Sequence, residues 1–206
     1  MTLLNPYPDI CYFHTDIVSE DNKKLHSLEI LWSNQFKSDQ RRLEYISGRR
    51  CAHLAMEQAG FFNIPILTNR DRSPNWPSSI TGSITHSSSD AAALIVGPGH
   101  LVQGVGIDLE NLKRSVNPNI SSHVLNPEEQ KHWFTQKSTS LQNLKIIFSI
   151  KECIFKCFYP KHKVYLGFMD AAILDLSENS FKAVLTRSPI TGKLTEMEIS
   201  GRLQIT

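Results

Sequence analysis

The first part of the chain places apolar residues at helical spacing and then alternates apolar and polar residues. A first helix is predicted from apolar positions three or four residues apart, namely Leu25, Leu28, Leu31, Trp32 and Phe36. A second helix is expected from Ser38 and Asp39 to about Gln58, with Gly60 as its C-terminal stop. Two strands follow over residues 79–86 and 91–97, each bounded by Pro, Ser or Gly.

The second half of the chain repeats this order loosely. Residues 101–110, LVQGVGIDLE, alternate apolar with small or polar residues and therefore predict a strand. Asn126, Pro127 and Glu129 predict the N-cap, the first residue and the capping-box acid of a short helix. A long helix is expected over about 141–158, with Pro160 helping to end it. Three alternating runs then predict strands, at residues 171–176, 180–186 and 194–206.

These elements predict an α+β fold of two similar lobes, each a small antiparallel sheet packed with a helix. The boundary is expected near Pro98 and Gly99. The N-terminal lobe would then comprise residues 1–100 and the C-terminal lobe residues 101–206.

Composition indicates an ordinary globular protein. Of the 206 residues, 40% are hydrophobic and 20% are charged, and a net charge of +2 does not favour binding to nucleic acid or to a membrane surface. The opening segment contains two prolines and no basic region, so we expect no secretory signal. No apolar run approaches the ~20 residues of a membrane span. The four cysteines form no CxxC pair, which favours reduced packing residues in a cytoplasmic protein.

Two acids, Asp108 and Glu110, follow the apolar residues of the predicted strand over 101–110. Residues i and i+2 of a strand point to the same face, so the two carboxylates would repel unless a cation or a proton lay between them. A hard ion such as Mg²⁺ suits these oxygen ligands. The alternative is that the strand has ended and that the acids lie in a solvated turn.

The segment FSIKECIFKCF, residues 148–158, adds a charged stripe to a mainly apolar helix. Ser149, Glu152 and Lys156 follow one another at i, i+3 and i+7 and so share one helical face. Glu152 could supply a third carboxylate beside the first two acids. Alternatively, Glu152 and Lys156 form a structural ion pair, worth ~0.3 to 0.5 kcal/mol at a surface.

Two further groups of residues suit phosphate. In GSITHSSS, residues 82–89, His86 ends a strand and precedes three serines, which could hold a phosphate with it. Taken by itself, His86 is better interpreted as a hydrogen-bonded loop histidine. Arg42, Tyr45 and Arg49 share one helical face. The neighbouring basic residues are Arg41, Arg50, Arg70 and Arg72. Guanidinium groups recognise phosphate oxygens, although such a cluster is also typical of a solvated surface.

Taken together, these stretches resemble the 4′-phosphopantetheinyl transferases, in particular the two-lobed class that serves nonribosomal peptide and siderophore synthetases. VGIDLE (105–110) and FSIKECIFK (148–156) match the paired signature of that family. WPSSITGSITHS (76–87) and SGRRCAHLAM (47–56) are similar to its enterobactin-synthetase branch. The matching blocks span roughly residues 40–160, whereas the two ends of the chain match only in general pattern.

The resemblance implies two lobes related by a pseudo-twofold axis, in a monomer. It implies that coenzyme A donates phosphopantetheine to a serine of an apo acyl or peptidyl carrier protein and that 3′,5′-ADP leaves. Asp108, Glu110 and Glu152 would hold Mg²⁺. Either Glu152 or a water oriented by Glu110 would take the serine proton.

The resemblance also implies roles for the basic residues. Lys156 would bind the phosphate region and stabilise or protonate the leaving group, with Lys151 as a second candidate. Thr85 and His86 would contact coenzyme A phosphates. Arg49 and Arg72 would lie in the basic lining, although Arg72 is displaced by one position from the family pattern.

The carrier is expected to dock on residues 112–134, where apolar and basic residues adjoin. The candidates are Lys113, Arg114, Val124, Leu125, Trp133 and Phe134, and the alternative is that the apolar residues pack the lobe. Two other functions stay open, a Mg²⁺-dependent phosphohydrolase and a non-catalytic protein that binds coenzyme A or a carrier. The sequence does not distinguish between carriers and pathways, between Mg²⁺ and Mn²⁺, or between a monomer and a weak dimer.

Overall fold

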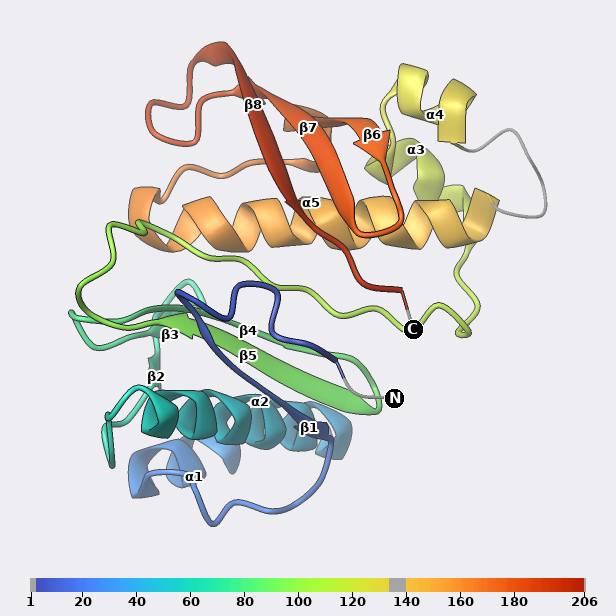
Figure 1. Cartoon of the computed structure of the whole chain (residues 1–206). Coiled ribbons are helices and arrows are strands. Elements are labelled where there is room, and N and C mark those ends of the chain that lie inside the picture. Colours follow the sequence, from blue (N-terminus) through green and yellow to red (C-terminus); the bar gives the residue numbers. More distant parts are fainter. Residues whose placement is uncertain (1–2, 134–139, 206) are drawn as a thin grey trace. The chain divides into compact units, whose positions relative to one another are not determined.

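The computed structural model describes residues 3–133 and 140–205, which form two compact units (Figure 1). The first comprises Leu4–Leu109, and the second begins at Glu110 and also takes in Leu3. Each contains a long helix and a three-stranded antiparallel sheet, which confirms the predicted α+β class. The division falls after Leu109 rather than at residue 100, because the segment between these positions packs on the first sheet.

The first unit is built on a sheet with the strand order β1-β5-β4. Its strands are β1 (Tyr12–Ile17), β4 (Thr81–His86) and β5 (Asp90–Val96). Its helices are α1 (Ser27–Ser33) and α2 (Asp39–Gln58), and a small hairpin pairs β2 (Leu67–Thr68) with β3 (Pro74–Asn75). Strand β1 and the small hairpin were not predicted, whereas both helices were.

Local signals explain where α2 begins and ends. The side chain of Ser38 accepts a hydrogen bond from the Arg41 backbone N–H, as an N-cap residue does. After the helix, Gly60 has a φ of +83°, a left-handed conformation that glycine adopts without a Cβ clash. Both boundary predictions are confirmed.

Both faces of the first sheet are covered, which explains why β5 is buried almost throughout. On one face, Ala93 and Ile95 pack with Ala52 and Met56 of α2 in one core cluster. The other face carries Leu94 and Val96, which pack with residues of the segment that follows β5. These covering residues are Val102, Val105 and Ile107.

Residues 101–110 form no strand, so this prediction was wrong. The apolar alternation reflects side chains that pack on the face of the sheet. The backbone does not join the sheet edge: the Ile107 N–H donates to the Ser83 hydroxyl oxygen at 3.1 Å. Asp108 and Glu110 therefore do not share the face of a strand, contrary to the prediction.

The second unit has the strand order β6-β7-β8. Its strands are β6 (Ala171–Leu176), β7 (Ser180–Arg187) and β8 (Leu194–Arg202), close to the predicted runs. Its helices are η1 (Pro118–Ile120), α3 (Ser121–Val124), α4 (Pro127–Trp133), α5 (Ser140–His162) and η2 (Phe168–Asp170). The predicted capping box of α4 is confirmed, because Asn126 and Glu129 each accept the other's backbone N–H.

Helix α5 continues past Pro160 to His162, so the predicted end near residue 158 was too early. The Lys163 N–H donates to the Tyr159 carbonyl oxygen at 2.9 Å, which closes the turn that contains Pro160. A proline this near the end of a helix interrupts few backbone hydrogen bonds.

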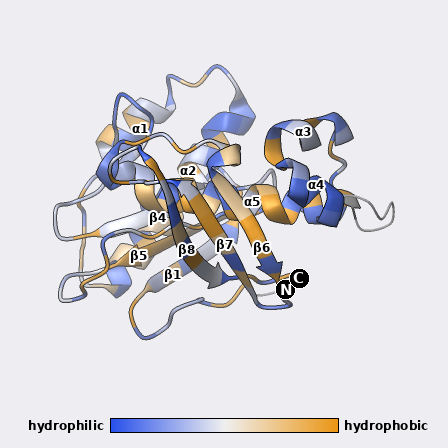
Figure 2. Cartoon of the chain, turned by 90° about the horizontal axis from the view of Figure 1, so that it is seen from above, coloured by the Kyte–Doolittle hydropathy of each residue, from blue (hydrophilic) through white to orange (hydrophobic). Residues whose placement is uncertain are grey.

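The core of the second unit includes residues that were expected at a carrier-docking patch. Val124 and Leu125 are 2% and 0% exposed and pack with Leu144 and Ile147 of α5, so they form no docking surface. Trp133 packs partly against the same core, and Phe134 lies outside the described residues. Figure 2 shows the contrast in hydropathy between strands β6 and β7 and the largely hydrophilic helix α4. Among the described residues, no helix has the length and apolar character needed to cross a membrane.

Candidate functional site

Asp108 is fixed to the first sheet by Thr85. The Thr85 hydroxyl donates to Oδ1 of Asp108 at 3.0 Å, and Thr85 itself is 2% exposed. The preceding residue, Ile107, is held by Ser83 of the same strand. The structure thus brings together two of the predicted site residues, and a neutral hydroxyl orients the carboxylate without neutralising its charge.

His86 follows Thr85 on β4, and its side chain leaves the opposite face of the sheet. Its Nδ1 lies 3.5 Å from Oε2 of Glu44, near the start of α2. Thr85 and His86 therefore stand in different surroundings. Their common role as phosphate contacts remains a prediction.

Arg49 lies almost buried on α2, with 5% of its surface exposed. Its Nη2 donates to the Thr68 hydroxyl at 3.2 Å, and its guanidinium carbon lies 4.8 Å from the centre of the Tyr45 ring. Its Nε is 4.0 Å from Oε1 of Glu29, an ion-pair distance. A phosphate contact would have to be made by the small part of Arg49 that reaches the surface.

Arg72 lies in the turn of the β2–β3 hairpin. Its backbone has a φ of 68°, in the left-handed region, and its N–H donates to the Asn69 carbonyl at 2.9 Å. The side chain is exposed. Arg49 contacts Thr68 of β2, so the two predicted arginines are associated with the same hairpin.

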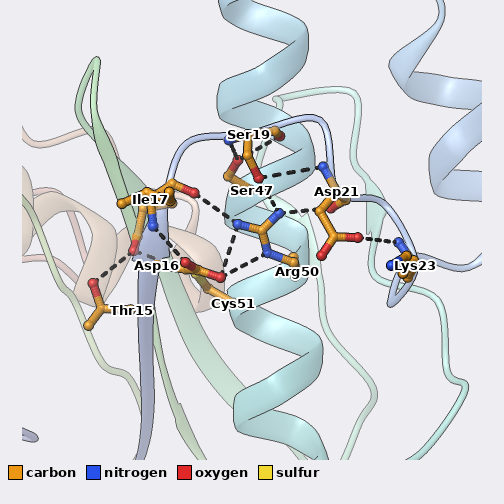
Figure 3. A network of polar contacts seen from close by, with 10 residues as sticks. Thr15, Asp16, Ile17, Ser19, Asp21, Lys23, Ser47, Arg50 and Cys51 are labelled. Atoms are coloured by element: carbon orange, nitrogen blue, oxygen red, sulfur yellow. Dashed lines mark hydrogen bonds and ion pairs between the residues drawn. The ribbon is translucent and has the colours of Figure 1, made fainter.

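Arg50 does not belong to a phosphate-binding face, because its guanidinium is held inside the first unit (Figure 3). Its Nη2 is 3.0 Å from Oδ2 of Asp16, and Nη1 donates to the Ser19 hydroxyl at 2.8 Å. The backbone carbonyls of Ile17 and Asp21 accept further hydrogen bonds, each at 2.8 Å. The adjacent arginines of α2 therefore have different surroundings, which residue type alone does not reveal.

Glu29 is a buried carboxylate that sequence reasoning missed. It is 0% exposed, and its oxygens accept the backbone N–H groups of His26 and Ile66, each at 2.8 Å. Its Oε2 lies 2.7 Å from Nε2 of His53 on α2. The available signal was a capping box with histidine as the cap, a residue that is not among the usual N-caps.

In the second unit, helix α5 carries Glu152 and Lys156 one turn apart, and both side chains are partly buried. Glu152 lines a depression, which we call the α5 hollow. Its other lining residues include Lys151, Phe155, Tyr165 and Phe168. The hollow thus combines one of the predicted site carboxylates with aromatic walls.

Lys151 points into the protein, unlike a lysine that binds phosphate at a surface. Its Nζ donates to Oε2 of Glu129 at 2.7 Å, and also to the carbonyls of Val124 and Phe168 at 2.8 and 2.9 Å. Burial lowers the pKa of the Lys151 ammonium, and the hydrogen bond and charge of Glu129 act in the opposite direction. This geometry argues against Lys151 as a phosphate ligand.

The three predicted metal ligands do not lie in one compact unit. Asp108 belongs to the first unit, whereas Glu110 and Glu152 belong to the second, where Glu110 is exposed. Within residues 3–133 and 140–205, no group of three or more His, Cys, Asp or Glu side chains is arranged to hold a metal ion. The metal site therefore remains a prediction.

Comparison with known families covers most of the chain. Residues 35–96 match the 4′-phosphopantetheinyl transferase N-terminal domain, and residues 104–200 match the 4′-phosphopantetheinyl transferase superfamily. The chain belongs to the 4′-phosphopantetheinyl transferase superfamily. The second match covers the paired signature. It includes the four charged residues that were predicted for the site, namely Asp108, Glu110, Glu152 and Lys156.

Individual members of the superfamily share about a quarter to a third of their residues with the chain. 4′-Phosphopantetheinyl transferase PptT of Mycobacterium tuberculosis is 36% identical over 134 residues, which are 65% of this chain and 58% of that protein. 4′-Phosphopantetheinyl transferase Npt of Nocardia iowensis is 29% identical over 66% of this chain and 60% of its own length. Enterobactin synthase component D of Salmonella typhi is 28% identical over 78% of this chain and 68% of its own length. The chain thus spans less than two thirds of the first two relatives.

Proposed function

We propose that this chain is a Mg²⁺-dependent 4′-phosphopantetheinyl transferase that uses coenzyme A to modify a carrier protein. The observation that carries the proposal is the superfamily match over residues 104–200, which contains Asp108, Glu110, Glu152 and Lys156 together. A non-catalytic relative would have no need to keep three carboxylates and a lysine at these spacings.

Asp108, Glu110 and Glu152 are the residues that would hold the metal ion. Their donors are all carboxylate oxygens, which suit a hard cation that keeps further positions for water and phosphate. The hydrogen bond from Thr85 orients the Asp108 carboxylate, which supports its proposed role as a metal ligand. When bound, Mg²⁺ would neutralise charge on the pyrophosphate of coenzyme A.

In the proposed reaction, a serine oxygen of the carrier forms a bond to the β-phosphorus of coenzyme A. The bond from that phosphorus to the bridging oxygen breaks, and 3′,5′-ADP leaves with the electron pair. Lys156 would stabilise the charge that develops on the leaving phosphate or donate a proton to it. The serine proton would pass to Glu152 or to a water oriented by Glu110.

The α5 hollow has a volume of about 90 Å³, which suits only a short part of the pantetheine arm. Glu152 lies in its wall, so a pyrophosphate bound by that carboxylate's metal would place the arm beside Phe155 and Phe168. Aromatic walls would cover the methylene groups of the arm and exclude water from them. We propose that this hollow receives the part of the arm next to the pyrophosphate.

We further propose that the enzyme works as a cytoplasmic monomer on carriers of nonribosomal peptide or siderophore synthesis. The basis is the similarity to proteins named enterobactin synthase component D. The described cysteines are free thiols, as expected in a reducing compartment.

Charge-matched variants test the proposal. Asp108→Asn and Glu152→Gln should each lower the rate of phosphopantetheine transfer by about 100-fold or more, because each removes a charge from the metal site. Glu196→Gln is the control, since this exposed residue of β8 loses the same charge at a distance in sequence from every site residue. Circular dichroism would establish that the variants fold. Equal loss in all three variants, or no loss in the first two, would contradict the assignment.

A further inference from the structure

The strongest unassigned feature of the second unit is the buried pair of Lys151 and Glu129. Their side chains are 1% and 2% exposed, and Nζ lies 2.7 Å from Oε2. The Lys151 ammonium has three N–H donors, and the structure gives it three acceptors, the Glu129 carboxylate and two backbone carbonyls. Its hydrogen-bonding capacity is therefore used within the protein.

Both carboxylate oxygens of Glu129 also accept hydrogen bonds within the protein. Its Oε1 accepts the Ile173 N–H at the start of β6 at 2.7 Å, and its Oε2 accepts the Asn126 N–H at 2.8 Å as well as Lys151. Through these contacts and the two carbonyls, the pair connects α5 to the end of α3, the start of α4, η2 and β6. The pair thus ties together three separate stretches of the chain.

The pair lies beside the proposed active site. Glu152 directly follows Lys151 on α5, and successive residues of a helix point about 100° apart. The inward direction of Lys151 therefore sets the direction of Glu152. The Lys151 contact to the Phe168 carbonyl also fixes η2, which contributes Phe168 to the wall of the α5 hollow.

We propose that Lys151 and Glu129 are a positioning pair, which sets Glu152 and the wall of the α5 hollow, and that the Lys151 ammonium does not bind the phosphates of coenzyme A. The inference rests on the proposed function for its effect on catalysis. Removing one partner leaves an uncompensated buried charge, whereas replacing both by neutral residues removes both charges together. If the two residues act as a positioning pair, replacing both should restore the activity that is lost when only one is replaced. If Lys151 binds substrate, a second substitution at Glu129 should not restore activity.

The first experiment compares Lys151→Met, Glu129→Gln and the double variant. Lys151→Met should lower the melting temperature by about 10 °C and kcat by about 10- to 100-fold. In the double variant, the amide that replaces the Glu129 carboxylate keeps an acceptor for Ile173 and can donate to a carbonyl that Lys151 leaves, while the Asn126 N–H loses one hydrogen bond. This variant should recover most of the melting temperature and of kcat, with the KM for coenzyme A unchanged. A folded double variant that is as slow as Lys151→Met would overturn the proposal.

A second measurement uses the unaltered protein and so does not depend on folding of a variant. Lysines are labelled with acetic anhydride in the native protein, with and without coenzyme A and Mg²⁺, and each site is quantified by mass spectrometry. Lys151 should stay unlabelled in both samples, whereas Lys156 should be labelled in the free protein and protected by coenzyme A. Labelling of Lys151 that coenzyme A suppresses would refute the positioning role. Failure of the unaltered protein to transfer phosphopantetheine would instead refute the proposed function.

Discussion

Replacing Arg50 by methionine tests whether this arginine supports the fold rather than binding a phosphate. Methionine keeps an unbranched stem of similar reach and deletes the guanidinium. Arg50 is 3% exposed, and its contacts join α2 to Asp16 at the end of β1 and to the loop that follows. The substitution would leave the carbonyls of Ile17 and Asp21 and the Ser19 hydroxyl without this donor.

The loss in the free energy of unfolding depends on which hydrogen-bond acceptors of Arg50 can bind water instead. The Asp16 side chain is 38% exposed, so its carboxylate can bind water in place of Arg50. Loss of this ion pair should therefore change the free energy of unfolding little. The two carbonyls lose charge-assisted hydrogen bonds that are worth about 1.5–3 kcal/mol each. The free energy of unfolding should therefore fall by about 3–6 kcal/mol, which for a chain of this length lowers the melting temperature by roughly 10–20 °C.

Urea denaturation followed by circular dichroism would measure this change. Arg41→Met is the matched control, because the Arg41 side chain is 71% exposed and lies 4.0 Å from Glu44. The control should change the unfolding free energy by less than about 0.5 kcal/mol. Below its transition, Arg50→Met should keep the KM for coenzyme A. Equal stability of the two variants, or a raised KM in Arg50→Met alone, would show that Arg50 does not act as a structural residue.

Packing and burial lead to further expected outcomes. Gly82→Ala should cost about 1–3 kcal/mol in a thermal or urea melt, because the added Cβ would lie 2.6 Å from Cζ2 of Trp76. Burial raises the pKa of the Cys11 and Cys51 thiols to about 11 and about 12, so iodoacetamide at pH 8 should alkylate them only in urea. Their stabilising contribution should be complete below about pH 9 and decline as pH rises above it. Burial lowers the pKa of His14 below 6.5, so stability should fall as pH drops below 6.5, and by less in His14→Gln.

Much of the fold could be predicted because its signals are local. Ser38 and Gly60 mark the ends of α2 by their own backbone chemistry, and the capping box of Asn126 and Glu129 identifies the start of α4. The alternating runs of β6 to β8 likewise follow from residues that pack on one face of a sheet.

The wrong or missed predictions concern residues whose structure depends on contacts with distant parts of the chain. Alternation over residues 101–110 fits a strand, yet the same pattern results when a segment packs Val105 and Ile107 on the face of a sheet. Arg49 and Arg50 are identical in type and adjacent, and only their tertiary contacts distinguish them: Arg50 donates to the β1–α1 loop, whereas Arg49 donates to Thr68. Lys151 and Glu129 are 22 residues apart, so no helical spacing could have paired them.

The most direct test of the central proposal is the intact mass of an apo peptidyl-carrier domain after incubation with this protein, coenzyme A and Mg²⁺. We expect a gain of one phosphopantetheine mass together with release of 3′,5′-ADP. An EDTA sample and the Asp108→Asn variant should both lack this gain. If several carriers gain no mass while coenzyme A still binds, the protein is a binding protein and not a transferase; cleavage of coenzyme A without carrier modification would identify a phosphohydrolase.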